Sequence, residues 1–136
     1  MAFLTINDLH TKILDYELTE ITGGDNTLIE SAISAAVSEL KVYLNDSFDT
    51  DQIFNKTGSD RHQLLVQCGA DIAIYFLVAR VQAGQDVDDR RRRYDRAINW
   101  LKMVNKSETY ADLPRREKNT ISGVIASSNP KRPNYY

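Results

Sequence analysis

The sequence predicts an all-α protein, a compact bundle of about four helices followed by an extended C-terminal arm. Two observations carry this prediction. Apolar residues recur at three- and four-residue spacing through most of the chain up to Asn105, which is the period of amphipathic helices. Only three prolines and six glycines occur in 136 residues, too few for a sandwich or barrel built on many tight turns.

Two helices are predicted in the N-terminal half. The first lies within residues 4–18, with Thr5 or Asn7 as its N-cap. The second follows the Gly-Gly pair at 23–24, with Asp25 or Asn26 as its cap, and runs to about residue 46. The apolar stripe of this second helix comprises Leu28, Ile29, Ala32, Ile33, Ala36, Val37, Leu40 and Leu44.

Residues 47–60 interrupt the helical pattern with turn-forming residues around Phe48, Ile53 and Phe54. Three large apolar side chains in a polar loop indicate a segment that is pinned to the domain or kept for a partner. The third helix, about 61–83, is apolar nearly all round and is expected to be central, with Gly84 as its stop. Its expected stripe comprises Leu64, Leu65, Cys68, Ile72, Tyr75, Phe76 and Ala79.

The fourth helix is expected to begin at a cap formed by Asp86 or Asp88. Its inward stripe comprises Tyr94, Ala97, Ile98, Leu101 and Val104. Past Asn105 the helical pattern fades, and the end of the chain has the composition of an extended segment. We therefore expect a helical domain at 1–113 and an arm at 114–136 that becomes ordered only on assembly.

The sequence contains no motif for catalysis or cofactor binding: no phosphate-binding glycine loop, HExxH, CxxC pair, calcium loop or nucleophile elbow. His10 and His62 do not have metal-ligand spacing. Ser59, Asp60 and His62 lie close together in "GSDRH", but a catalytic triad depends on convergence in space, not on adjacency in sequence. A turn followed by a helix that Ser59 or Asp60 caps, with His62 in its first turn, explains this stretch.

Two residues of the third helix remain as candidates for a chemical role. Asp71 interrupts an apolar helix and is expected to face a boundary or to pair with an arginine of the fourth helix. Cys68 is the only cysteine, so no internal disulfide is possible, and a buried small hydrophobe is its expected role. We expect no enzyme activity, no metal and no cofactor. The N-terminus does not resemble a signal peptide, and the charges at Asp71 and Arg80 argue against a membrane span, so a soluble protein made inside the cell is expected.

Charge is divided unequally along the chain. Residues 1–60 carry three basic and eleven acidic residues, a net charge of −8, whereas residues 61–136 carry fourteen basic and eight acidic residues, a net charge of +6. Acidic and basic surfaces on one chain are complementary in a head-to-tail contact between copies. The overall charge of −2 gives no reason to expect general affinity for nucleic acid.

The run Arg90, Arg91, Arg92 and Arg93 opens the fourth helix. Successive helical residues point about 100° apart, so four arginines in a row cannot form one stripe along a phosphate backbone. Residues 86–96 also contain four aspartates, which leave a net charge of only +1. Three interpretations remain open: a solvated face with local ion pairs, a contact between subunits, or a contact with nucleic acid.

Four groups of residues follow one another over residues 4–105 in a familiar order. They are Leu4, Thr5, Asp8 and Leu9, then the small-residue-rich helix 29–44, then Ala70, Asp71, Ile72, Ala73, Tyr75 and Leu77, and finally Tyr94, Ala97, Trp100 and Leu101. In this order and spacing the chain resembles a family of small neck proteins of Mu-like phages and prophages. That family is similar to the wider class of helical head–tail connector, or adaptor, proteins of tailed phages. The sequence departs from the family pattern in its longer tail after Pro114 and in a 47–60 loop without a proline-rich run.

The resemblance implies a non-enzymatic virion protein, made in the bacterial cytoplasm, that joins the portal vertex to the neck or tail. It implies a ring of twelve copies around DNA that is not bound sequence-specifically. Its implied partners are other copies of itself, the portal protein and neck or tail completion proteins, with no membrane. Arg90 to Arg93 are the expected subunit contact, and the expected partner-binding residues of the arm are Arg115, Arg116, Lys131, Arg132, Tyr135 and Tyr136. The alternative is a small helical DNA-binding regulator that uses the fourth helix for recognition.

Overall fold

The structure, a computed structural model, describes residues 2–81, 86–106 and 112–116. These residues form no β-strand, only an isolated bridge between Phe48 and Arg115. The all-α prediction is therefore confirmed. The helices are α1 (Ile6–His10), α2 (Asp15–Thr22), α3 (Asn26–Leu44), α4 (Thr50–Phe54), α5 (Gln63–Val81) and α6 (Asp86–Asn105), with a single 3₁₀ turn, η1 (Gly58–Asp60).

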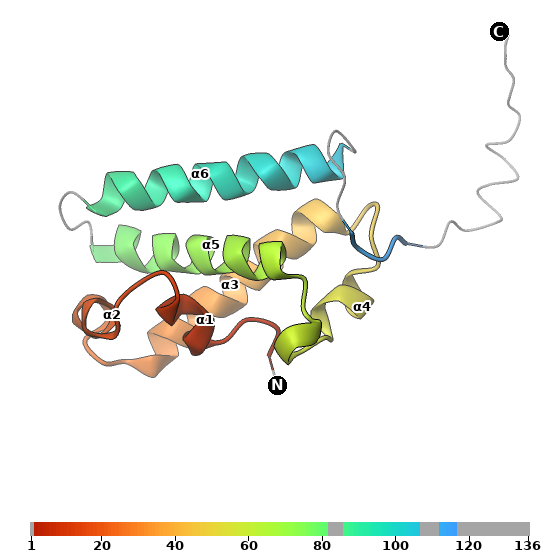
Figure 1. Ribbon diagram of the computed structural model, residues 1–136. Helices are drawn as coiled ribbons and strands as arrows, with labels where there is room; N and C mark the ends of the chain where they lie inside the picture. Colours follow the sequence, from red (N-terminus) through yellow and green to blue (C-terminus); the bar gives the residue numbers. More distant parts are fainter. Residues whose placement is uncertain (1, 82–85, 107–111, 117–136) are drawn as a thin grey trace, which may run out of the picture.

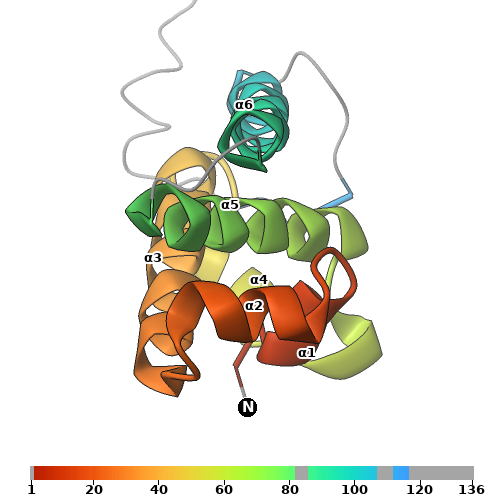
Figure 2. The same ribbon diagram turned by 90° about the vertical axis from the view of Figure 1, so that its left-hand side faces the viewer.

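Helix α5 lies at the centre of the bundle (Figure 1). Helix α6 covers one side of α5, α3 crosses beside it, and α1 and α2 lie on the side away from α6; Figure 2 shows the same order of layers from a second direction. This position explains why the sequence of α5 is apolar nearly all round, as predicted. Gly69 lets the neighbours approach closely, since a Cβ there would lie 3.2 Å from a methyl of Leu4 and 3.3 Å from one of Leu40.

The first predicted helix is divided in two. Thr5 is its N-cap, as one of the two alternatives had it, but the helix ends at His10 and a second begins at Asp15. Thr11 bends its hydroxyl back to donate to the carbonyl of Asp8 (2.7 Å), a local bond that competes with helix continuation. The turn that follows brings the half-buried Lys12 to Asp71 of α5. Asp25 caps α3, as predicted, by accepting from the amide of Thr27.

The 47–60 loop is pinned to the domain. Phe48 and Ile53 are buried, and the ring of Phe54 meets that of Phe3 edge-on at a centroid distance of 4.7 Å. A short helix, α4, that periodicity alone did not predict carries Ile53 and Phe54, and Asp49 caps it by accepting from the amide of Gln52. Pinning is thus confirmed for Phe48 and Ile53, whereas Phe54 is half-buried.

The inward stripe of α6 lies where the sequence predicted it. Leu101 and Val104 are fully buried, and Tyr94 stacks on Tyr75 while donating a hydrogen bond from its hydroxyl to Glu39 of α3 (2.7 Å). Asp86 and Asp88 both lie inside the helix, so Asp88 is not its cap. The predicted stop at Gly84 lies outside the described residues. In α5, Leu64 is 55% exposed, so its predicted place in the inward stripe is wrong; it lies in the first turn of the helix.

Candidate interaction surfaces

Two of the four consecutive arginines are held within the chain. The guanidinium of Arg90 donates to the backbone carbonyl of Lys12 through both of its terminal nitrogens, at 3.2 and 3.3 Å. Arg93 forms an ion pair with Asp89, one turn earlier on α6, at 3.3 Å. Arg90 therefore fastens α6 to the turn between α1 and α2, and Arg93 takes part in a local pair of the kind expected on a solvated helix face.

Arg91 and Arg92 are the two members of the run that point into solvent. Neither has a hydrogen bond or an ion pair with any residue that the structure describes. The run is thus not one functional unit: half of it serves the fold of the domain, and half is available for contacts with another molecule.

Lys12 and Asp71 form a partly buried ion pair, with Nζ 3.2 Å from Oδ2. The predicted arginine partner of Asp71 is therefore wrong; the turn after α1 brings a lysine there instead, and the arginine of α6 binds that lysine's carbonyl. The other carboxylate oxygen of Asp71 is buried and has no hydrogen-bond partner among the described residues. An unpaired carboxylate at the position of Asp71 would destabilise the fold by several kcal/mol, so the pairing with Lys12 stabilises it.

Cys68 lies one helical turn before Asp71. Burial, with the nearby Asp71 carboxylate, raises the pKa of its thiol to about 12. Since the thiolate is the reactive form, this cysteine has little nucleophilic character near neutral pH. Its environment fits the predicted role of a small packing residue.

His62 precedes α5 and occupies the position of its N-cap. Its Nδ1 accepts from the amide of Leu65, at 3.4 Å, and its carbonyl accepts from the amide of Val66. The prediction that Ser59 or Asp60 caps this helix is therefore wrong, because η1 and the extended Arg61 separate them from it. In the part of the chain that the structure describes, no group of three or more His, Cys, Asp or Glu side chains is placed to hold a metal ion.

Arg61 ties the start of the chain to the start of α5. It binds the carboxylate of Asp8 through two nitrogens, at 2.6 and 3.1 Å, and also donates to the carbonyl of Phe3. Burial tends to raise the pKa of Asp8, but the bonds from Arg61 and Thr5 outweigh it and hold that pKa below 3.8. Sequence periodicity gave no sign of this pair, since both partners lie outside the long helices.

Arg115 and Arg116, both predicted to bind a partner, contact their own domain. The guanidinium of Arg115 lies over the ring of Phe48, 4.9 Å from its centroid, and the side chain of Arg116 donates to that of Asn45 (2.7 Å). Two backbone bonds accompany them, from the amide of Asp49 to the carbonyl of Pro114 and from that of Arg116 to Ser47. Residues 114–116 thus lie against the 45–49 segment.

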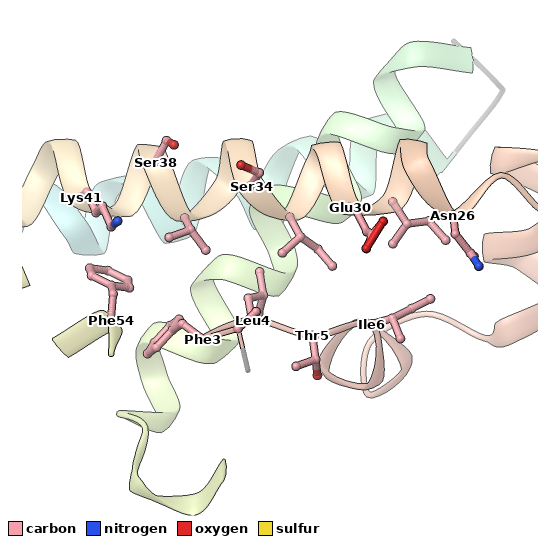
Figure 3. Close-up of a pocket in the computed structure, with 14 residues that line it drawn as sticks. Phe3, Leu4, Thr5, Ile6, Asn26, Glu30, Ser34, Ser38, Lys41 and Phe54 are labelled. Atoms are coloured by element: carbon pink, nitrogen blue, oxygen red, sulfur yellow. The ribbon is translucent and has the colours of Figure 1, made fainter. Parts of the chain in front are cut away.

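A groove of about 630 Å³ separates α3 from the N-terminal segment 2–6 (Figure 3). Ile29, Ile33 and Val37 line it along α3, with Phe3 and Phe54 opposite. Glu30, Ser34, Ser38 and Lys41 add a polar edge along α3 (Figure 3). Such a surface suits an apolar side chain or a short peptide segment.

The outer face of α6 is a second candidate surface, and sequence analysis missed it. Trp100 is half-buried and Met103 is 42% exposed; together with Arg92, Arg96 and Asn99 they border a shallow hollow of about 530 Å³. Tryptophan, methionine and arginine are enriched in the centres of protein interfaces. The spacing of residues 92, 96, 99 and 103, opposite the buried Leu101, could have pointed to this stripe.

Helix α5 also meets the length and hydropathy of a membrane span over Gln63–Arg80. Half of that window is buried inside the bundle, where α3, α6, α1 and α2 surround the helix. Asp71, which forms the partly buried ion pair with Lys12, lies within the same window. We interpret α5 as the core helix of the domain.

A family model described as "Bacteriophage Mu, Gp36" matches residues 3–126. The chain belongs to this bacteriophage family. No curated protein and no solved structure matches the chain. The match confirms the resemblance to a Mu-like phage family that the order of the helical motifs indicated.

Within this member of the Gp36 family, most of the residues that carried the resemblance are packing residues. Leu4, Leu9, Ala70, Ile72 and Leu101 are each at most 1% exposed. Lys131, Arg132, Tyr135 and Tyr136, the remaining candidates for partner binding, lie outside the described residues and beyond the end of the family match at residue 126. Their role stays a prediction.

Proposed function

We propose that this phage protein is a structural head–tail connector of the virion. Copies form a ring, of twelve subunits as the resemblance implies, between the portal vertex and the neck or tail. DNA passes through the lumen without sequence-specific binding. The protein is not an enzyme and needs neither cofactor nor membrane; its partners are other copies of itself, the portal protein and neck or tail completion proteins.

The observation that carries the proposal is the outer face of α6. Arg92 and Arg96 are exposed there beside Trp100 and Met103. The opposite face of the helix is buried in the core of the bundle. A face of this composition is suited to bury against protein, because arginine and aromatic groups supply both pairing and apolar area. The division of the sequence into an acidic N-terminal part, residues 1–60, and a basic C-terminal part, residues 61–136, supports contacts between identical copies.

The exit point of the C-terminal segment supports a second kind of contact. Arg115 and Arg116 fasten the chain beside the 45–49 segment, and twenty residues follow them. An extended segment of that length reaches about 65 Å, which is enough to cross onto a neighbouring subunit or the portal. Lys131, Arg132, Tyr135 and Tyr136 then provide cationic and aromatic groups at the far end of this arm.

Mass measurement beside DNA titration tests the proposal. We expect a mass that grows with concentration, or on addition of the phage's portal ring, in multi-angle light scattering, with little affinity for a DNA duplex at about 0.1 M salt. A DNA-binding regulator behaves in the opposite way: it remains a small species and binds duplex with an affinity that falls steeply with salt. That second outcome would overturn the connector proposal.

A further inference from the structure

Helix α2 presents an acidic face to solvent. Leu18 and Thr22 are buried against the bundle, whereas Tyr16 and Glu20, one turn apart, lie on the opposite side of the helix. The side chain of Tyr16 is 66% exposed, an unusual position for a large aromatic group. Asp15, which lies 3.2 Å from the ring of His10, and the half-buried Glu17 flank this stripe, and α2 contains no basic residue.

Helix α6 presents the complementary surface. Arg92, Arg96, Asn99 and Met103 follow one another at spacings of four, three and four residues along its outer side, opposite the buried Leu101. The shallow hollow of about 530 Å³ lies along this stripe, with Trp100 at its edge. One acidic residue, Asp95, also borders the hollow, against two arginines.

The two faces lie on opposite sides of the molecule. Figures 1 and 2 show α6 on one side of α5 and α2 on the other, and both views agree. The outward stripes of α2 and α6 therefore point away from each other and cannot meet within one chain. They can meet only between two copies.

We propose that α2 of one copy docks on the outer face of α6 of the next copy, with the ring of Tyr16 in the hollow beside Trp100 and Met103. Glu20, one turn along α2, then meets Arg92 and Arg96. The contact uses two different surfaces of the same chain, so each added copy offers a free surface to the next copy until the ring closes. This inference rests on the proposed self-assembly and names the surfaces that produce it.

Charge complementarity and apolar area both support this pairing. The planar guanidinium groups of Arg92 and Arg96 are suited to bidentate pairing with carboxylates. All the charged side chains of α2 are carboxylates. The exposed tyrosine ring and the exposed methionine each gain by burial against the other. A contact of α6 with a second α6 would instead bring arginine stripes together.

Charge reversal tests the contact. We expect Glu20→Arg and Arg92→Glu/Arg96→Glu each to weaken self-association by about tenfold or more, measured by sedimentation at a series of concentrations with or without the portal ring. Glu20→Arg combined with Arg96→Glu in one chain should recover most of the loss. Asp60→Arg repeats the charge change of Glu20→Arg, and Lys56→Glu repeats that of one arginine reversal; both positions are exposed and lie outside the contact, so these variants serve as controls.

Cysteine cross-linking provides a second test that does not depend on charge. Tyr16→Cys combined with Met103→Cys should give a ladder of disulfide-linked dimers, trimers and larger species under mild oxidation, since each copy contributes one thiol to each neighbour. Either single variant should give no ladder. Native Cys68 is retained in all three chains because its thiol is partly buried and has a pKa of about 12.

The outcomes separate the two proposals. Assembly that survives both charge reversals, with no cross-linked ladder, overturns the α2–α6 contact and leaves the connector ring in place. A wild-type chain that gains no mass at any concentration, alone or with the portal ring, overturns self-assembly and with it both proposals. Loss of assembly on reversal, recovery in the combined variant and a ladder that needs both cysteines support the contact.

Discussion

At the scale of single residues, side chains that the sequence offered as candidates for a chemical role stabilise the fold instead. His62 accepts from the amide of Leu65 with Nδ1, which requires that nitrogen to be unprotonated. Burial lowers the pKa of His62 from 6.5, although the carboxylate of Asp112 opposes part of that shift. Protonation of His62 therefore places a charge in a partly buried site, and it also removes the hydrogen-bond acceptor at the start of α5.

This arrangement predicts a pH dependence of stability with a definite sign. The folded-state pKa of His62 is below the unfolded value of 6.5, so the unfolded chain binds more protons in the window just below 6.5. The free energy of unfolding should be highest above pH 6.5 and should fall as the pH is lowered through that window. His62→Asn keeps a capping acceptor and removes the titration, so the decrease between pH 7.5 and 5 in urea unfolding should become smaller.

The ion pair of Asp8 and Arg61 does not contribute to this change in stability. The pKa of Asp8, which its bonds to Arg61 and Thr5 lower, lies below 3.8, so its contribution is lost only at more acid pH. An equal loss of stability between pH 7.5 and 5 in the wild type and in His62→Asn would contradict the assignment of His62 as the titrating cap.

Residue pairs were the least predictable feature of the molecule. The sequence showed that Asp71 interrupts an apolar helix and needs a partner, but it could not show which one. Lys12 is 59 positions away in the chain and reaches Asp71 only because the helix breaks after His10. The bonds of Arg61 to Asp8 depend in the same way on the path of a loop. Pairing across the fold is set by tertiary geometry, which local periodicity does not encode.

At the scale of elements, helix length decided what could be predicted. The long helices α3, α5 and α6 each contain five turns or more, so their apolar period is repeated often enough to recognise. The short helices α1 and α4 have five residues each, barely more than one turn, and show no period. Side-chain capping and packing of Phe48 and Ile53 specify that region instead.

The 112–116 segment yields a prediction about where the folded domain ends. Its backbone pairs with residues 47 and 49, and Arg115 covers the ring of Phe48. A chain ending at residue 125 or at residue 116 should therefore melt at the wild-type temperature, whereas a chain ending at residue 111 should be less stable by about 1–2 kcal/mol. The expected loss reflects two backbone hydrogen bonds and an exposed aromatic ring.

The same three chains separate folding from docking. Calorimetry gives their melting temperatures, and co-sedimentation with the portal ring gives their binding. We expect the chain ending at residue 125 to lose portal binding without losing stability. Unchanged binding in that chain would exclude the terminal residues, including Tyr135 and Tyr136, from the docking contact.

At the scale of the whole molecule, the arrangement of faces was beyond the reach of the sequence. The sequence showed that residues 1–60 are acidic and residues 61–136 are basic. That α2 and α6 lie on opposite sides of α5 depends on how the helices pack, and the exposure of Tyr16 depends on which side of a short helix is buried. Only the folded chain shows that the two charged faces point in opposite directions.

Packing also divides the arginine run, and this division yields a prediction. Arg90 donates two hydrogen bonds to the carbonyl of Lys12, whereas Arg92 is exposed and has no partner among the described residues. Arg90→Gln should lower the free energy of unfolding by about 1.5 kcal/mol, since it removes a charged donor from a partly buried carbonyl. Arg92→Gln should leave stability within about 0.5 kcal/mol of the wild type and weaken self-association.

Urea unfolding at low protein concentration, beside sedimentation at high concentration, measures the two effects separately. Both substitutions remove one positive charge from the same helix, so each is the control for the other. If assembly depended on the net charge of the run, the two variants would weaken it equally. Because only Arg92 lies on the outer stripe, unequal effects are expected, with stability lost in one chain and association lost in the other.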